Sequence, residues 1–139
     1  MLKILKKIVQ EVSSAKDLSQ ALDLIIKHVT QALHADSSSI FLADDLKGEY
    51  VLLASVGLNS GIIGKARIKF GEGLVGLVGE RGEPINIDNA PDNVNYFYLK
   101  NSGEEFYRAF LGVPIIYQGE LLGVLVVQQK AIRFFAEDT

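Results

Sequence analysis

The stretch FYRAFLGVPIIYQGELLGVLVVQQ, residues Phe106–Gln129, decides the fold. Two apolar runs, Phe110–Tyr117 and Leu121–Val127, flank a short loop at residues 118–120 that has Gly at its centre. This arrangement is typical of the two strands of a hairpin. Because neither run alternates between apolar and polar residues, both faces must be covered, and we expect the hairpin in the middle of a sheet. Pro114 cannot donate a ladder hydrogen bond, which indicates an edge strand or a bulge, and we expect a bulge.

The composition indicates one globular domain. The chain has 139 residues, a hydrophobic fraction of 48% and a net charge of −3. No basic cluster is visible, so we expect neither nucleic acid nor a membrane as a partner. No apolar run approaches the roughly 20 residues of a membrane span. Because Lys6 and Lys7 interrupt the early apolar residues, we expect no secretory leader. The absence of cysteine fits a reducing compartment, and we expect a cytoplasmic protein.

Two helices are expected before the first strand. Apolar residues recur at helical spacing over residues 2–12. A second helix is expected to begin with Asp17 and Gln20 as a capping box. Its apolar face then comprises Leu18, Ala21, Leu22, Ile25, Val29, Ala32 and Leu33.

Short strands dominate the middle of the chain. We expect them at residues 38–43, 50–56, 66–70 and 84–87, with a short helix before the last of these that stops at Gly82. The glycines at 71, 73, 76 and 79 indicate close backbone contacts. The irregular segment Asp88–Glu105 is long enough to be a lid. Residues 134–139 are typical of a first helical turn, so we expect a fragment of a longer protein whose C-terminal helix is cut off. The order of elements predicts an α+β fold with an antiparallel sheet.

The chain resembles a GAF domain in three segments. These are SVGL (Ser55–Leu58), GEGLVGLVGERGEPINIDNA (Gly71–Ala90) and LGVPIIYQGELLGVLVV (Leu111–Val127). The resemblance covers essentially the whole chain, residues 1–139, as a single domain. It implies a profilin-like central antiparallel sheet with a helical layer on one face and a lidded ligand pocket on the other. The helical layer often forms a dimer interface, so a homodimer through the helices is expected.

A narrower resemblance is to the N-terminal GAF domains of nitrogen-branch phosphoenolpyruvate–protein phosphotransferases. It is carried by SSSIFLADD (Ser37–Asp45), FGEGLVGLVGERGEPINIDNA (Phe70–Ala90), RAFLGVPII (Arg108–Ile116) and LLGVLVVQQK (Leu121–Lys130). It implies a sensor of nitrogen-status metabolites, glutamine or 2-oxoglutarate, that modulates autophosphorylation of the parent enzyme. A phosphocarrier protein would then be a partner of other domains of the parent.

The chain itself offers no catalytic group that we can assign. Without cysteine, the thiol chemistry of methionine-sulfoxide-reducing GAF proteins and the attachment of a bilin are excluded. The NKFDE-type signature of cyclic-nucleotide-binding GAF domains is missing, and Gly71-Glu72-Gly73 lacks the spacing and Lys of a phosphate loop. His28 and His34 are six residues apart and share no helix face, which disfavours a metal site. We expect no enzymatic activity, cofactor or metal in this chain.

A carboxylate-binding pocket is the site that the residues suggest. Arg108 opens the hairpin just after the lid and could hold a ligand carboxylate in a bidentate pair, although a salt bridge to Glu104 or Glu105 is an equal alternative. Peptide N–H groups near Gly73 and Leu74 could supplement that charge. The remaining candidates are Asp88 and Asn89 as acceptors, Tyr96 and Tyr98 as walls, and Ser39 and Phe41 as the floor.

The competing interpretation is a ligand-free dimerisation module. In that case the pocket would be filled by its own side chains, among them Phe41, Phe97 and Phe110. A roomy cavity would favour the sensor.

Overall fold

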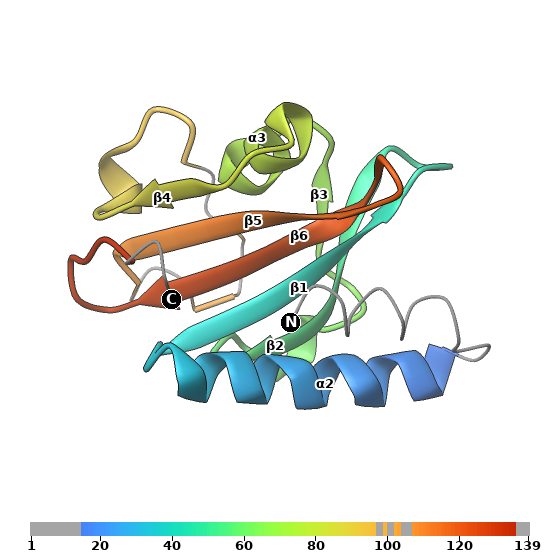
Figure 1. Cartoon of the computed structure of the whole chain (residues 1–139), viewed down its shortest axis with the longest axis horizontal. Coiled ribbons are helices and arrows are strands. Elements are labelled where there is room, and N and C mark those ends of the chain that lie inside the picture. Colours follow the sequence, from blue (N-terminus) through green and yellow to red (C-terminus); the bar gives the residue numbers. More distant parts are fainter. Residues whose placement is uncertain (1–14, 97–98, 100–101, 104–106, 136–139) are drawn as a thin grey trace.

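The centre of the molecule is an antiparallel sheet of six strands in the order β3-β2-β1-β6-β5-β4 (Figure 1). The computed structural model describes residues 15–96, 99, 102–103 and 107–135. The strands are β1 Ser37–Asp44, β2 Glu49–Val56, β3 Arg67–Lys69, β4 Ile85–Ile87, β5 Ala109–Tyr117 and β6 Glu120–Gln129. The helices are α2 Ala15–Ala32 and α3 Gly73–Arg81, with the 3-10 turns η1 Ser60–Ile62 and η2 Ala90–Asp92. The α+β class and the antiparallel sheet are confirmed.

The hairpin of β5 and β6 lies inside the sheet, as expected. The loop is shorter than predicted, because Glu120 is already the first residue of β6 and pairs with Tyr117. Gln118 and Gly119 have φ values of 50° and 78°, the conformation of a tight two-residue hairpin turn. The register shift falls between Ile115 and Ile116 and not at Pro114, so the predicted bulge is displaced by one residue. Pro114 lies past the three residues of β5 that pair with β4. On that side β5 has no neighbouring strand at Pro114, so the missing N–H of the proline costs no hydrogen bond to β4.

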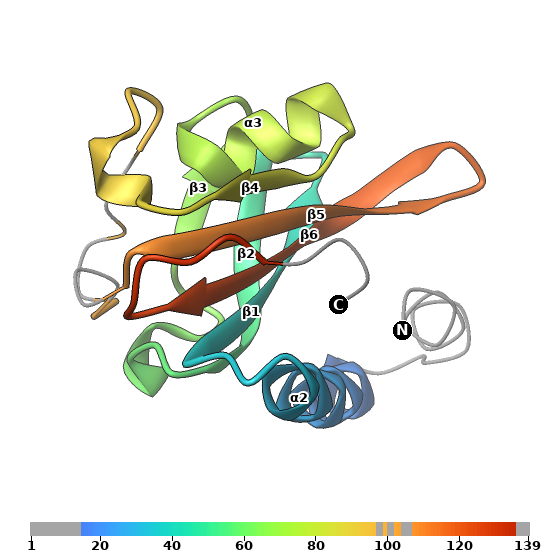
Figure 2. The ribbon, with the colours of Figure 1, turned by 60° about the vertical axis from the view of Figure 1, so that its left-hand side comes forward.

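Helices cover both faces of the sheet (Figures 1 and 2). On one face α2 packs Leu22, Ile26 and Val29 against side chains that include Leu125 and Val127 of β6. On the other face α3 packs Leu74, Val75 and Val78 against side chains that include Val124 and Val126. Alternate residues of one strand therefore enter two separate cores, which explains why the hairpin carries no polar stripe.

The structure changes the predicted limits of α2. The helix begins at Ala15, so Asp17 lies inside it and is not its N-cap. Ile26 is fully buried, although the predicted apolar face contained Ile25 in its place, and Ala32 is exposed. The helix expected at residues 2–12 lies outside the described residues.

The short helix α3 ends where predicted. Gly82 has φ 65° in the left-handed region, and its N–H donates to the carbonyl of Val78. The close contacts expected of the glycines occur at two of them. A Cβ on Gly76 would come within 2.6 Å of the backbone of Gly71, and one on Gly79 would overlap the hydroxyl of Tyr50. These glycines let α3 lie close to its neighbours.

The segment after β6 packs against the α2 side of the sheet. Phe135 is buried in the core beside α2, and Asn86 of β4 hydrogen-bonds both its N–H and its carbonyl, at 3.2 and 2.7 Å. The guanidinium of Arg133 lies 4.4 Å from the centre of the Phe135 ring and donates to the carbonyl of Leu33. Residues 136–139, where the start of a helix was predicted, lie outside the described residues.

Candidate functional site: a cavity between α3 and the sheet

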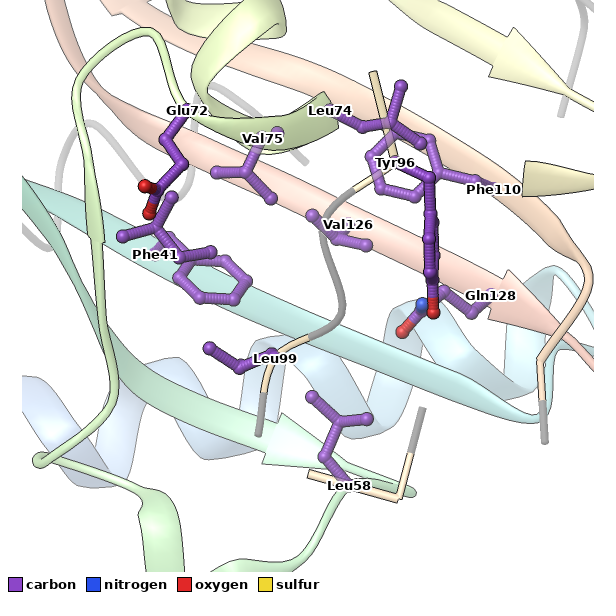
Figure 3. A pocket seen from close by; sticks show the side chains of 12 residues that line it. Phe41, Leu58, Glu72, Leu74, Val75, Tyr96, Leu99, Phe110, Val126 and Gln128 are labelled. Carbon is purple, nitrogen blue, oxygen red and sulfur yellow. The ribbon is translucent and has the colours of Figure 1, made fainter. Parts of the chain in front are cut away.

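A small cavity lies between α3 and the sheet (Figure 3). Its volume is about 30 Å³. The walls come from β1, β3, β5 and β6, the chain just after β2, the start of α3, and described residues of the segment that was predicted to form a lid. They comprise Phe41, Leu58, Ile68, Glu72, Gly73, Leu74, Val75, Tyr96, Leu99, Phe110, Val126 and Gln128.

Strand alternation supplies the floor of this cavity. Val126 and Gln128 are two apart on β6, so they share the face that α3 covers. Phe110 of β5 is the direct partner of Gln128, and Phe41 of β1 lies opposite Val124. The two phenylalanines are 4% and 3% exposed and belong to the core between α3 and the sheet.

The start of α3 places a carboxylate in the cavity wall. Glu72 is the N-cap residue of α3, but its side chain makes no capping hydrogen bond. It lines the cavity instead, and it is the one charged side chain among the described lining residues. Figure 3 shows Glu72 at one end of the cavity and Gln128 at the other.

The Gln128 end of the cavity is polar. Gln128 is 5% exposed although it carries an amide. Its partner across the sheet, Ser37, is fully buried on the same face, and the Ser37 hydroxyl has no hydrogen-bond partner among the described residues. Ser39, the next residue on this face, pairs its hydroxyl with that of Ser55 at 2.9 Å. Unpaired buried polar groups are costly unless a ligand or water satisfies them.

Four of the predicted site residues line the cavity: Phe41, Gly73, Leu74 and Tyr96. Ser39 lies on the same sheet face but is not a lining residue. Tyr98 lies outside the described residues.

Arg108 is not among the residues that line the cavity. Its side chain is exposed, while its N–H donates to the carbonyl of Gln129 and its carbonyl accepts from the N–H of Ala90, both at 2.7 Å. The backbone of Arg108 therefore extends the sheet, and its side chain is not among those that line the cavity. Glu104 and Glu105, its alternative partners, lie outside the described residues.

Asp88 and Asn89 also lie outside the cavity wall. Asn89 precedes η2 and donates its side-chain N–H to the carboxylate of Asp92 at 2.8 Å. Its amide oxygen is buried and has no hydrogen-bond partner in the part of the chain that the structure describes. The amide therefore helps to organise the turn at η2.

Sequence reasoning missed the two polar residues that face the cavity. The sequence does hold a signal for Gln128. It follows Val124 and Val126 at every second position, so it lies on the same face of the strand as these two valines. Glu72 offered no such signal, since an acid before a helix is usually a cap.

The described residues contain no group of three or more His, Cys, Asp or Glu side chains that could hold a metal ion. None of the described helices is long and apolar enough to cross a membrane.

With this geometry established, comparison with known proteins identifies the class. The family model for the GAF domain matches residues 17–139, and the chain belongs to the GAF domain family. It is 42% identical over 137 residues to a protein of Escherichia coli K12 named phosphoenolpyruvate-dependent phosphotransferase system. That match covers 99% of this chain but 18% of the relative, so the chain spans less than a fifth of the relative's length.

Solved structures narrow the relationship. The GAF domain of a phosphoenolpyruvate–protein phosphotransferase from Coxiella burnetii is 56% identical, with a TM-score of 0.83, over 99% of this chain and 82% of that chain. The corresponding domain from Acinetobacter is 38% identical, with a TM-score of 0.77, over 99% and 81%. The predicted resemblance to the GAF domains of these phosphotransferases is confirmed.

Proposed function

We propose that this domain is the regulatory sensor of a phosphoenolpyruvate–protein phosphotransferase of the nitrogen branch. A small nitrogen-status metabolite would bind in the cavity and modulate autophosphorylation by other domains, which would pass the phosphoryl group to a phosphocarrier protein. The homology to phosphotransferase GAF domains supports the parent enzyme. An enclosed apolar site with a few polar groups is the usual form of a small-molecule pocket.

The polar groups favour glutamine over 2-oxoglutarate. Glu72 would repel the carboxylates of 2-oxoglutarate, and no lining residue offers a positive charge in return. Glutamine carries one carboxylate instead of two, an ammonium that can donate hydrogen bonds to Glu72, and an amide that can pair with Gln128. The placement of Glu72 and Gln128 in an otherwise largely apolar wall is the observation that carries this proposal.

Binding would require the cavity to open. Its volume of about 30 Å³ is roughly that of one water molecule. Ligand pockets are about 300–1,000 Å³. The ligand would therefore select a more open arrangement, for example one in which the segment of Tyr96 and Leu99 moves away from the sheet.

The small volume also favours a second candidate, a ligand-free dimerisation module. Phe41 and Phe110, two of the three phenylalanines that this interpretation places in the pocket, are buried and line the cavity, while Phe97 lies outside the described residues. In that case the outer face of α2, where Leu24 is 70% exposed, is available to a second copy of the chain. Light scattering of the chain with and without the candidate ligands measures its oligomeric state.

Thermal denaturation with glutamine, 2-oxoglutarate and unrelated acids tests the sensor. A ligand at about 100 times its dissociation constant stabilises by roughly 2.7 kcal/mol, which raises the midpoint of a domain of this size by several degrees. We expect a rise with glutamine that is lost in Glu72→Gln and Gln128→Met. The matched control is Glu83→Gln, because Glu83 is exposed and lies outside the cavity wall.

The outcomes separate the two candidates. A larger rise with 2-oxoglutarate than with glutamine would contradict the role given to Glu72. No rise with either metabolite, together with a stable dimer, would favour the dimerisation module.

A further inference from the structure

A second, more open hollow lies beside α3. Its volume is about 380 Å³, and it is lined by Asp45, Tyr50, Phe70, Gly71, Gly79, Glu80 and Leu121; we refer to it as the acidic groove. Residues 70 and 71 border the acidic groove, while residues 72 and 73 border the cavity described above. The two sites are therefore separate but share one short loop.

An unpartnered hydroxyl faces the acidic groove. Tyr50 is 2% exposed, and its hydroxyl has no hydrogen-bond partner among the described residues. Gly79 makes room for it, because a Cβ there would overlap the hydroxyl oxygen, and Leu121 lies alongside. Burial, followed by the charge of Asp45, raises the pKa of Tyr50 above its usual value. The hydroxyl therefore stays protonated and can accept or donate a hydrogen bond.

Two carboxylates line the same groove as that hydroxyl. Glu80 places an oxygen 3.8 Å from the position that a Cβ on Gly71 would take, which puts the carboxylate over the wall of the groove. Asp45 is close enough for its charge to act on Tyr50. Neither carboxylate forms an ion pair or hydrogen bond within the described part of the chain.

An exposed aromatic ring also lines the acidic groove. Phe70 is 43% exposed, and its ring centre lies 4.8 Å from that of Tyr50 at an angle of 53°. An exposed ring beside carboxylates attracts organic cations, because its π face is negative. The apolar side chain of Leu121 offers contact to a methylene stem.

We propose that the acidic groove binds a primary alkylammonium group, carried by a free amine or by a lysine side chain. The ammonium has three N–H donors, which match the carboxylates of Asp45 and Glu80 and the hydroxyl oxygen of Tyr50. The methylene stem would lie against Phe70 and Leu121. This inference stands apart from the proposed function, since it requires no ligand in the cavity between α3 and the sheet.

The test is an NMR titration of the amide signals of the 139-residue chain. The probes are N-acetyl-lysine N-methylamide, n-butylammonium and, as a neutral control, N-acetyl-norleucine N-methylamide. We expect saturable shifts at Gly71, Gly79 and Glu80 with the two amines, at dissociation constants of about a millimolar. Shifts with the lysine compound alone would show that the groove binds lysine side chains of proteins. Shifts with both amines would show that it also binds free amines.

Variants decide whether the named groups bind. The double variant Asp45→Asn/Glu80→Gln is expected to weaken amine binding about tenfold, and Tyr50→Phe a few-fold, with the thermal midpoint preserved. Glu83→Gln, an exposed acid outside the groove, is the matched control and should leave binding unchanged. Equal shifts with the norleucine compound, or unchanged affinity in the double variant, would overturn the proposal.

Discussion

At the scale of single residues, Tyr107 joins the start of the hairpin to the end of β2. It is 6% exposed, and its hydroxyl donates to the carbonyl of Gly57 at 2.7 Å. Gly57 has φ 97°, and a Cβ there would lie 2.6 Å from the carbonyl oxygen of Asp36. Asp36 in turn accepts a hydrogen bond from the N–H of Lys130 at 2.7 Å. Tyr107 therefore holds Gly57, just after β2, at a point where Gly57 lies against the residue that precedes β1.

This environment gives Tyr107 a stability effect at alkaline pH. Burial, followed by the charge of Asp36, raises its pKa above the 10.0 of an exposed tyrosine. The unfolded chain therefore loses this proton at lower pH than the folded one, so the contribution is complete below pH 10 and falls as the pH rises through the folded pKa. Urea unfolding should show Tyr107→Phe about 1 kcal/mol less stable near neutral pH, with the difference shrinking above about pH 10. Parallel pH profiles for the two proteins would contradict this assignment.

At the scale of elements, the sequence predicts the sheet well and the site less well. The hairpin, its two covers and the stop of α3 at Gly82 follow from local patterns, because apolar runs and left-handed glycines act within a few residues. Whether Arg108 reaches the cavity depends on how β5 meets β6 and η2, and those hydrogen bonds join segments far apart in the chain. The sequence does not predict the start of α2 at Ala15, because an acidic residue such as Asp17 stabilises a helix in its first turn as well as at its N-cap.

The close approach of α3 to the sheet can be tested at Gly79. In an unobstructed helix, Gly→Ala gains up to about 1 kcal/mol. Here the added Cβ meets the hydroxyl and ring of Tyr50, so we expect Gly79→Ala to cost about 1–3 kcal/mol in urea unfolding. Adding Tyr50→Phe should recover part of the loss, since the hydroxyl is the nearest atom. Glu80→Ala, at the next and exposed helix position, should change stability by less than about 0.5 kcal/mol. A stabilised Gly79→Ala protein would mean that α3 lies further from the sheet.

At the scale of the whole molecule, one sheet divides two cores with different roles. The core beside α2 includes buried residues of α2, β1, β2, β5 and β6, among them Ile115 of β5. The core beside α3 includes Phe110 of the same strand and borders the candidate site. Adjacent residues of β5 enter different cores. Substitutions in this one strand can therefore change the core beside the candidate site and the core beside α2 independently.

The proposed sensor makes a distinct prediction for such a pair. Phe110→Leu should enlarge the cavity and cost about 1–2 kcal/mol of stability. If closure of the cavity limits binding, this variant populates the open arrangement more and its apparent affinity for glutamine rises, by about threefold or more. Ile115→Val is the matched control, because it removes volume from the other core, with a cost of about 0.5–1.5 kcal/mol, and should leave the affinity unchanged. Isothermal titration calorimetry with both variants measures this directly. Equal affinities in wild type, Phe110→Leu and Ile115→Val would show that the cavity volume does not limit binding. No binding in any of the three would favour the dimerisation module, in which Phe110 serves only to pack α3 on the sheet.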